Sequence, residues 1–420
     1  MAAAGGRCRD AVSRARPVLG DDRAGVAPMT APASVVYVVP DKMGGMMNII
    51  ANLLEYRRPD GVGHHALLTH NHLHTDTRFA RPLAADTQTT VEYTLPVENL
   101  HAVMRRLARA VPPGSGVYVA GDLLDLATAS VHDFGRAVIY MLHGDSDYYY
   151  DLAAKHDAVI HAFIAYSRRM HERLVARLPH RAGTIFHLPY GIPLPAGVAR
   201  ANHGRLRLAF AGRLEQGQKG VFDLPEIDRL LAAQGVAVDW TIAGGGPDEI
   251  ELKRRWAFNP NVRWLGVLSN AEVIMMYATQ DVFVLPTRVE GFPVALVEAM
   301  GAGVVPVVSD IESGVPEVVV SALTGERPPV GDVRAFAQAL AALDGDRPRL
   351  AAMGAAARRS IAERFDIRDR VADYQALYAR WRELYRPLAA GRHLQYGSRL
   401  DQPWIPNAVV RFVRSAAKRP

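Results

Sequence analysis

The sequence predicts a two-domain α/β protein in which each domain is a doubly wound parallel sheet flanked by helices. Its 420 residues exceed one ordinary hydrophobic core and fit two domains of about 150–200 residues. Short apolar runs alternate with helical stretches along the chain, and the alternation pauses once, near residue 195, before it starts again. Two copies of one alternating pattern therefore predict two Rossmann-like halves.

In the N-terminal half, the first predicted strand is Ser34–Val39, a β-branched run typical of a strand buried on both faces. Gly44 and Gly45 follow it, and a helical stretch then covers Met46–Tyr56. The further strands that we predict here are Ala66–Thr69, Gly116–Ala120, Ala137–Leu142, Ala158–Ala165 and Thr184–Leu188, with helices over Val97–Ala110 and Arg168–Leu178.

Three prolines and a glycine in Pro189–Pro195 mark a linker, after which the pattern restarts. Strands are predicted at Leu206–Ala211, Asp239–Ala243, Val262–Leu265, Val282–Leu285 and Val304–Val308, and a last helical stretch at Ile367–Tyr385. We therefore divide the chain into a disordered leader (1–32), an N-terminal domain (33–194), a C-terminal domain (195–385) whose final helix packs back on the N-terminal domain, and a basic tail (386–420).

Composition restricts the class of protein. The net charge of +6 lies in the tail, because residues 386–420 carry seven Lys or Arg and one Asp while the rest of the chain is balanced. A neutral body argues against nucleic-acid binding. One cysteine, Cys8, excludes a disulfide framework, and no apolar run has the roughly 18 residues of a membrane span. Residues 1–28 have five Arg, three Asp and no apolar core, which favours a leader or a start codon upstream of Met29 over a targeting segment.

The strongest motif follows the strand Val282–Leu285, at the edge where doubly wound sheets bind ligands. Glu290 and Glu298 stand eight residues apart, the first in a loop and the second on the helix that starts near Ala295. The first amides of such a helix suit a phosphate, and the two carboxylates can accept hydrogen bonds from sugar hydroxyls. The alternative is a pair of surface carboxylates beside a buried helix.

A second motif, Arg213 to Lys219, follows the strand Leu206–Ala211. Arginine offers a bidentate fork for phosphate oxygens and lysine a compact charge, so these cations could stabilise a leaving diphosphate. A solvated charged loop is the alternative. The glycine turn at Gly244–Gly246 permits close approach to a ligand, although an ordinary strand-to-helix turn has the same composition.

Together these residues resemble the GT4-type family (glycosyltransferase group 1) of retaining GT-B glycosyltransferases. The resemblance covers about residues 205–325, and the N-terminal half agrees through Gly44-Gly45, His143-Gly144, Ser167 and the Pro189–Pro193 hinge. It implies the GT-B fold, with two Rossmann-like domains facing each other across a cleft. Ser313 departs from the family pattern, where a second glycine is common.

The resemblance also implies roles for individual residues. Arg213 and Lys219 would hold the donor pyrophosphate, Glu290 the transferred sugar and Glu298 the ribose. The backbone of Leu265 and Gly266 would face the base, and His143 would lie near the donor sugar and the acceptor. The amides of Gly291 and Phe292 would lie beside Glu290, and Gly45 would approach the phosphates from the other domain. Such enzymes need no bound metal and no cofactor beyond the nucleotide sugar, here UDP- or GDP-linked.

Two metal-like patterns carry less weight. Asp145-Ser-Asp147 resembles the metal-binding triplet of an unrelated fold, but it lies in the other domain from the cationic loop, so we favour an acceptor-side loop or a helix cap. The histidines of segment 64–74 lack a further ligand that would complete a zinc site, and a polar loop is the preferred interpretation.

The tail predicts a short helix after Pro406, capped by Asn407. Val409, Val410 and Val413 would share one face, and Arg411, Arg414 and Lys418 another, as in an interfacial helix on an anionic membrane. The alternatives are a helix packed on the protein and a solvated end.

We thus expect a cytoplasmic enzyme, at the inner face of the membrane if the tail docks, that transfers sugar with retention to a glycan, lipid-linked or small-molecule acceptor. Its place would be in cell-envelope or exopolysaccharide biosynthesis. A GT-B sugar-nucleotide 2-epimerase and a non-catalytic sugar-nucleotide-binding subunit are the alternatives.

Overall fold

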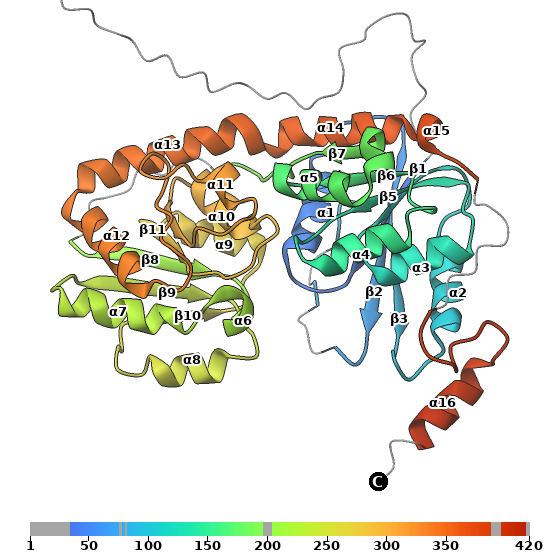
Figure 1. Cartoon of the computed structure of the whole chain (residues 1–420), viewed down its shortest axis with the longest axis horizontal. Coiled ribbons are helices and arrows are strands. Elements are labelled where there is room, and N and C mark those ends of the chain that lie inside the picture. Colours follow the sequence, from blue (N-terminus) through green and yellow to red (C-terminus); the bar gives the residue numbers. More distant parts are fainter. Residues whose placement is uncertain (1–33, 75–77, 80–81, 196–203, 388–395, 417–420) are drawn as a thin grey trace, which may run out of the picture.

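Two parallel β-sheets, one in each half of the chain, lie side by side in the computed structural model (Figure 1). The structure describes residues 34–74, 78–79, 82–195, 204–387 and 396–416, so the predicted leader and Cys8 lie outside the described residues. All strand pairs within both sheets are parallel.

The N-terminal sheet has seven strands in the order β3-β2-β1-β4-β5-β6-β7. Their bounds are β1 (Ser34–Pro40), β2 (Gly63–Asn71), β3 (Thr87–Tyr93), β4 (Gly116–Ala120), β5 (Arg136–Met141), β6 (Ala162–Ala165) and β7 (Ile185–His187). The helices of this half are α1 (Gly45–Glu55), α2 (Leu100–Ala110), α3 (Leu123–Val131), α4 (Asp147–Lys155), α5 (Arg168–Arg177) and the 3₁₀ helix η1 (Pro179–Thr184). Side-chain oxygens cap the start of three of them: Asn99 accepts from the His101 amide, Asp122 from the Leu123 amide and Ser167 from the Met170 amide.

The C-terminal sheet has five strands in the order β10-β9-β8-β11-β12. Their bounds are β8 (Leu206–Ala211), β9 (Val238–Ala243), β10 (Arg263–Gly266), β11 (Val282–Leu285) and β12 (Val305–Val308). The helices are α6 (Gln216–Lys219), α7 (Asp223–Ala233), α8 (Glu249–Arg255), α9 (Asn270–Tyr277), α10 (Val294–Gly301), α11 (Val315–Val318), α12 (Val333–Gly345) and α13 (Arg347–Phe365). On α7, buried Asp228 accepts from the indoles of Trp240 at 2.9 Å and Trp256 at 2.8 Å.

The chain returns to the N-terminal half through α14 (Ile367–Ala379) and α15 (Trp381–Leu384), which continue from α13 along one side of both halves (Figure 1). Backbone hydrogen bonds join the linker to the start of this return: the Ile192 amide donates to Phe365 O at 2.8 Å, and the Ile367 amide donates to Ile192 O at 3.0 Å. Farther along, Tyr374 donates to Leu188 O at 3.0 Å, and the rings of Tyr378 and Tyr37 lie 6.1 Å apart.

Segment 396–416, which ends in α16 (Asn407–Ala416), folds onto the N-terminal half beside α2 (Figure 1). Here the structure corrects two predictions. Asn407 does not cap the helix: its side chain accepts from the Asn99 amide at 2.8 Å and donates to Glu98 at 3.0 Å. Nor do the three valines share one face, because Val410 is buried whereas Val409 and Val413 are exposed.

Two further differences concern secondary structure. β3 was not predicted, because its polar sequence lies at the sheet edge with most side chains exposed and so lacks the apolar signal of a buried strand. The last predicted helix is broken at Arg380 into α14 and α15.

Candidate functional site

The candidate site lies where the loops after β8 and β11 meet. These strands are neighbours, with β9 and β10 on one side and β12 on the other, so the order of strand addition reverses between them. Ligands of doubly wound sheets bind outside the strands' carboxyl ends at such a reversal. The loop after β8 leads through Arg213 to Lys219, and the loop after β11 carries Thr287, Arg288 and Glu290.

An ion pair joins the two loops. Lys219 Nζ lies 2.5 Å from Glu290 Oε1, and the two side chains are only 16% and 6% exposed. Thr287 Oγ1, which is fully buried, lies 3.0 Å from the same carboxylate oxygen and 2.9 Å from Gln218 O. The site therefore holds a cation that can bind phosphate next to a carboxylate that can accept from a sugar hydroxyl. Thr287 was not predicted, since its role depends on a contact between distant loops.

The short helix α6 brings Lys219 to this position. Gly220 ends the helix in the left-handed conformation, with φ of 64°, and a Cβ there would lie 2.1 Å from Pro286 O. Next to it, the Arg288 amide donates to Gln218 O at 2.8 Å, and the Arg288 guanidinium bonds both carboxylate oxygens of Asp223 at 3.0 Å. The glycine and the arginine thus lock the two loops together.

Arg213 lies at the outer side of the same loop, 52% exposed, with its Nε 3.0 Å from Glu215 Oε2. Its backbone is held by the glycine turn after β9, because the Gly212 amide donates to Ala243 O and the Leu214 amide to Gly245 O, both at 3.0 Å. The Gly244–Gly246 turn therefore packs against the cationic loop.

Two helix N-termini converge beside the ion pair. α10 begins at Val294, four residues after Glu290, and α1 of the N-terminal half begins at Gly45. A Cβ on Gly45 would lie 3.1 Å from Val294 Cγ2, so the two helix starts touch. The first amides of each helix lack partners within the helix and carry partial positive charge, which together favour an anion at this point.

The loop after β11 also contacts the N-terminal half directly. A Cβ on Gly291 would lie 2.8 Å from Gly144 Cα, so only a glycine allows this approach. The next residue, Phe292, is 8% exposed, and its ring packs between Tyr190 (5.1 Å between centroids) and Phe365 (5.6 Å). The Phe292 side chain thus belongs to the interface between the halves, which leaves its backbone for a ligand.

Glu298 lies on α10, 4% exposed, and accepts from Asn270 Nδ2 at 2.6 Å. Burial raises the pKa of its carboxyl to about 7, despite the opposing hydrogen bond from Asn270. Across the sheet, Leu265 lies at a bulge where the register of β10 with β9 shifts, and Gly266 O accepts from the Gly244 amide at 2.7 Å. At the bulge, Leu265 has no pairing partner in β9. Its backbone is therefore not committed to that strand pair, which is compatible with the predicted contact with a base.

His143 follows β5, and its Nδ1 lies 3.2 Å from Tyr166 OH. Burial lowers the pKa of its imidazole to about 3, so the ring is neutral at physiological pH. A Cβ on Gly121 would lie 2.7 Å from His143 Nε2, and the next residue, Asp122, accepts from Tyr148 OH at 2.5 Å. Half-exposed Tyr148 and Asp122 thus add a polar, aromatic surface near His143 that sequence reasoning missed.

The two metal-like patterns have other partners. The Asp145 side chain is buried and accepts from Tyr150 at 2.5 Å, Arg173 at 2.6 Å and Arg169 at 3.1 Å. In segment 64–74, His72 lies 3.4 Å from Glu92. Within the described part of the chain, no cluster of three or more His, Cys, Asp or Glu side chains could hold a metal ion.

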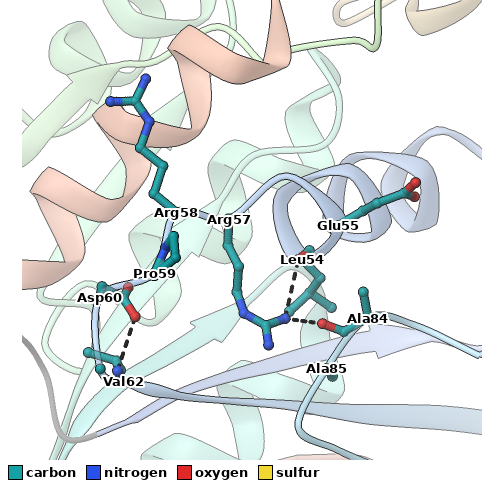
Figure 2. A pocket seen from close by; sticks show the side chains of 10 residues that line it. Leu54, Glu55, Arg57, Arg58, Pro59, Asp60, Val62, Ala84 and Ala85 are labelled. Atoms are coloured by element: carbon teal, nitrogen blue, oxygen red, sulfur yellow. Dashed lines mark hydrogen bonds between the residues drawn. The ribbon is translucent and has the colours of Figure 1, made fainter.

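A separate open groove of about 640 Å³ lies between the end of α1 and the start of β2 (Figure 2). Its Arg57 is bonded to Leu54 O and Ala84 O, and pairs with Asp86 at 2.7 Å. The groove adjoins the amino end of β2 in the N-terminal sheet, whereas doubly wound sheets bind ligands beyond the carboxyl ends of their strands, so the groove is not the candidate site.

Two doubly wound domains whose loops meet at such a point define the GT-B fold, and solved structures agree. HepE from Anabaena, determined in complex with UDP and glucose, superposes with a TM-score of 0.65 at 16% identity, over 81% of this chain and 99% of HepE. Residues 205–346 match the family model described as Glycosyl transferases group 1. The matched region holds Arg213, Lys219, Glu290 and Glu298.

Among curated relatives, WcaL of Escherichia coli K12, named for colanic acid biosynthesis, is 37% identical over 171 residues, or 38% of this chain and 42% of WcaL. AmsK of Erwinia amylovora, an amylovoran biosynthesis glycosyltransferase, is 33% identical over 175 residues, or 40% of this chain and 42% of AmsK. The match thus spans less than half the length of these relatives.

Among the described helices, none combines the length and the apolar composition that a membrane-spanning helix requires.

Proposed function

We propose that the protein transfers a sugar from a UDP- or GDP-linked donor to a glycan or lipid-linked acceptor in envelope or exopolysaccharide biosynthesis, with retention of the anomeric configuration. The observation that carries the proposal is the Lys219–Glu290 pair, at the reversal point of a group 1 glycosyltransferase domain and next to two helix N-termini. The names of WcaL and AmsK support the class of pathway.

In the proposed reaction, the bond from the anomeric carbon to the diphosphate oxygen breaks, and a bond from that carbon to the acceptor oxygen forms on the same face. The acceptor proton goes to the leaving diphosphate. Lys219, Arg213 and the first amides of α1 and α10 would stabilise the charge that develops on the diphosphate, because fixed cations and dipoles need no reorganisation during reaction. Glu290 would hold a hydroxyl of the transferred sugar.

The acceptor would approach from the N-terminal half, where His143, Asp122 and Tyr148 lie near the loop that Gly291 presses against Gly144. A neutral imidazole with its Nδ1 near Tyr166 can bond a sugar hydroxyl without competing for the anionic donor. The expectation that the enzyme works in the cytoplasm stays a prediction.

The first experiment is thermal denaturation with UDP, GDP, ADP, CMP and their common sugar conjugates. A donor at about 100 times its Kd adds roughly 2.7 kcal/mol of stability, so a true donor should be evident. A shift with one nucleotide that is lost in Arg213→Ala supports the donor site. No shift with any nucleotide or conjugate would count against the donor site.

Lys219→Ala and Glu290→Ala should each reduce transfer at least about tenfold, or roughly 1.4 kcal/mol of barrier, without loss of fold. Wild-type turnover in both variants would refute the site. Product analysis by NMR distinguishes transfer with retention from inversion and from 2-epimerisation of the donor, and either of the last two would refute the proposed reaction.

A further inference from the structure

The outer face of α16 is apolar, which reverses the usual pattern of a helix packed on a protein surface. Val409, Phe412 and Val413, spaced i, i+3 and i+4, lie on its outer side, with 48%, 76% and 41% of their surfaces exposed. Trp404, just before the helix, is 75% exposed. In Figure 1, α16 lies at the edge of the N-terminal half, on the far side from the C-terminal sheet.

The inner face of α16 is fixed firmly. Val410 is fully buried, and Arg414 pairs with Asp401 at 2.7 Å and donates to Pro96 O and Glu98 O, both at 2.6 Å. Arg414 therefore attaches the helix to the N-terminal half. It is not part of an outward basic face, contrary to the sequence prediction. The exposed face is thus held in place on the N-terminal half.

The charges of this segment indicate which kind of partner the exposed face of α16 binds. Asp401 is the one acidic residue from Tyr396 to the end of the chain, and Arg414 neutralises it. The segment's other charged residues are all basic, namely Arg399, Arg411, Lys418 and Arg419, of which Lys418 and Arg419 lie outside the described residues. Exposed apolar side chains bordered by basic residues complement an anionic lipid surface, where apolar groups enter the interface and cations stay at the headgroups.

Self-association fits less well. A stable protein–protein interface buries about 1,200–2,000 Å² in total, more than three side chains of a ten-residue helix would contribute together with Trp404. A symmetric pairing of two copies would also bring the basic residues of one tail against those of the other.

We propose that α16 and Trp404 dock the N-terminal domain on an anionic membrane. The docked domain carries the predicted acceptor side of the site, so the membrane would present a lipid-linked acceptor to it. This last step rests on the proposed sugar transfer, whereas the docking itself does not. The inference keeps the peripheral contact predicted from the tail but assigns it to different residues: Phe412, Trp404, Val409 and Val413 enter the interface, and Arg414 holds the helix.

The test is co-sedimentation of the full chain with phosphatidylcholine vesicles, with and without a fraction of phosphatidylglycerol. We expect binding to the anionic vesicles only. Phe412→Ser should weaken it at least about tenfold through lost apolar contact, and Arg411→Glu at least about fivefold through lost charge attraction. The matched control is Ile250→Ser, which removes an 86% exposed side chain from α8 of the other domain and should leave binding unchanged.

Trp404 supplies an independent readout. The chain has five tryptophans, of which Trp240, Trp256 and Trp381 are buried and Trp264 is half-buried, so a fluorescence blue shift on adding anionic vesicles reports on Trp404. Trp404→Phe should keep most of the binding and lose the shift.

Absence of wild-type binding to anionic vesicles, or equal binding by Phe412→Ser, would overturn the inference. Concentration-dependent dimers in sedimentation velocity that Phe412→Ser abolishes, without vesicle binding, would assign the face to a second copy and overturn it too. Donor binding by the same variants, measured without vesicles, separates these outcomes from failure of the proposed transfer.

Discussion

The affinity for the nucleotide-sugar donor should increase as the pH rises from about 6 to about 8, because an ionised carboxylate accepts hydrogen bonds at both oxygens and more strongly than a protonated carboxyl does. Glu298 is 4% exposed, and burial raises the pKa of its carboxyl to about 7 from an ordinary value of 4.5. If the ionised carboxylate holds the ribose hydroxyls, as the family resemblance implies, the binding-competent fraction is about 9% at pH 6 and about 91% at pH 8. The apparent Kd should therefore fall about tenfold over this range.

Burial raises the pKa of the Tyr277 and Tyr190 phenols, both of which interact electrostatically with Glu298, far above this window. Asn270, the hydrogen-bond partner of Glu298, has no ionisable group. The ligand must be an intact nucleotide sugar, because a free nucleoside diphosphate has a terminal phosphate whose second pKa of about 6 would add its own pH dependence.

Isothermal titration calorimetry at several pH values measures this effect. Glu298→Gln is the matched variant: it should bind more weakly at pH 8, with a Kd that stays constant across the range. A wild-type change of less than about threefold, or an equal slope in Glu298→Gln, would refute the reasoning. The same pKa shift predicts that the contribution of Glu298 to stability, measured as the difference between wild type and Glu298→Gln, falls by up to about 3 kcal/mol as the pH rises from 4.5 towards 7, because the folded state holds a proton that the unfolded state has released.

Three further substitutions test the geometry. Gly291→Ala places a Cβ 2.8 Å from the other domain's backbone and should reduce kcat at least about tenfold, while Gly183→Ala, whose Cβ meets only open space, should leave transfer rates unchanged. Thr287→Val keeps the side chain's size but removes the hydroxyl beside Glu290, so kcat should fall several-fold with little change in the donor KM, as steady-state kinetics would show. Asp228→Ala leaves two buried indole N–H groups without an acceptor and should lower the free energy of unfolding by about 2–4 kcal/mol. Urea unfolding followed by tryptophan fluorescence measures it, and a loss below about 1 kcal/mol would contradict the assigned hydrogen bonds.

The sequence predicted the fold well because buried parallel strands are continuous apolar runs. The run Leu206–Ala211 has the same bounds as β8, and Val282–Leu285 the same as β11. The signal weakens where a strand is not buried on both faces, as in β3, whose Thr-Gln-Thr-Thr segment resembles a loop. It also fails for α16, since periodicity shows that a helix has two faces but not which one meets the protein.

For the candidate site, the sequence could place residues at the ends of strands but could not pair them. Lys219 and Glu290 are 71 residues apart, and their contact depends on the neighbouring order of β8 and β11. Each was predicted to bind a different part of the donor, and nothing in the spacing indicated that they pair with each other. Thr287 and Asp122 are short polar residues of ordinary loop composition, so only the tertiary contacts distinguish them.

The contacts between the two halves differ in kind from the hinge to the site. At the hinge, Tyr190 and Phe292 interlock as aromatic side chains, and Ile192 is joined to α14 through its backbone. At the site, Gly291 meets Gly144 through main chain, and the side-chain contacts between the halves nearby are polar: Arg169 pairs with Glu312 at 3.0 Å, and Glu317 accepts from the Arg168 amide at 2.6 Å. A motion that separates the halves therefore costs least at the site and most at the hinge, which favours opening by rotation about residues 190–192. Such a rotation would separate the N-termini of α1 and α10. The partial positive charges of both helices would therefore act together on an anion only when the halves are in contact.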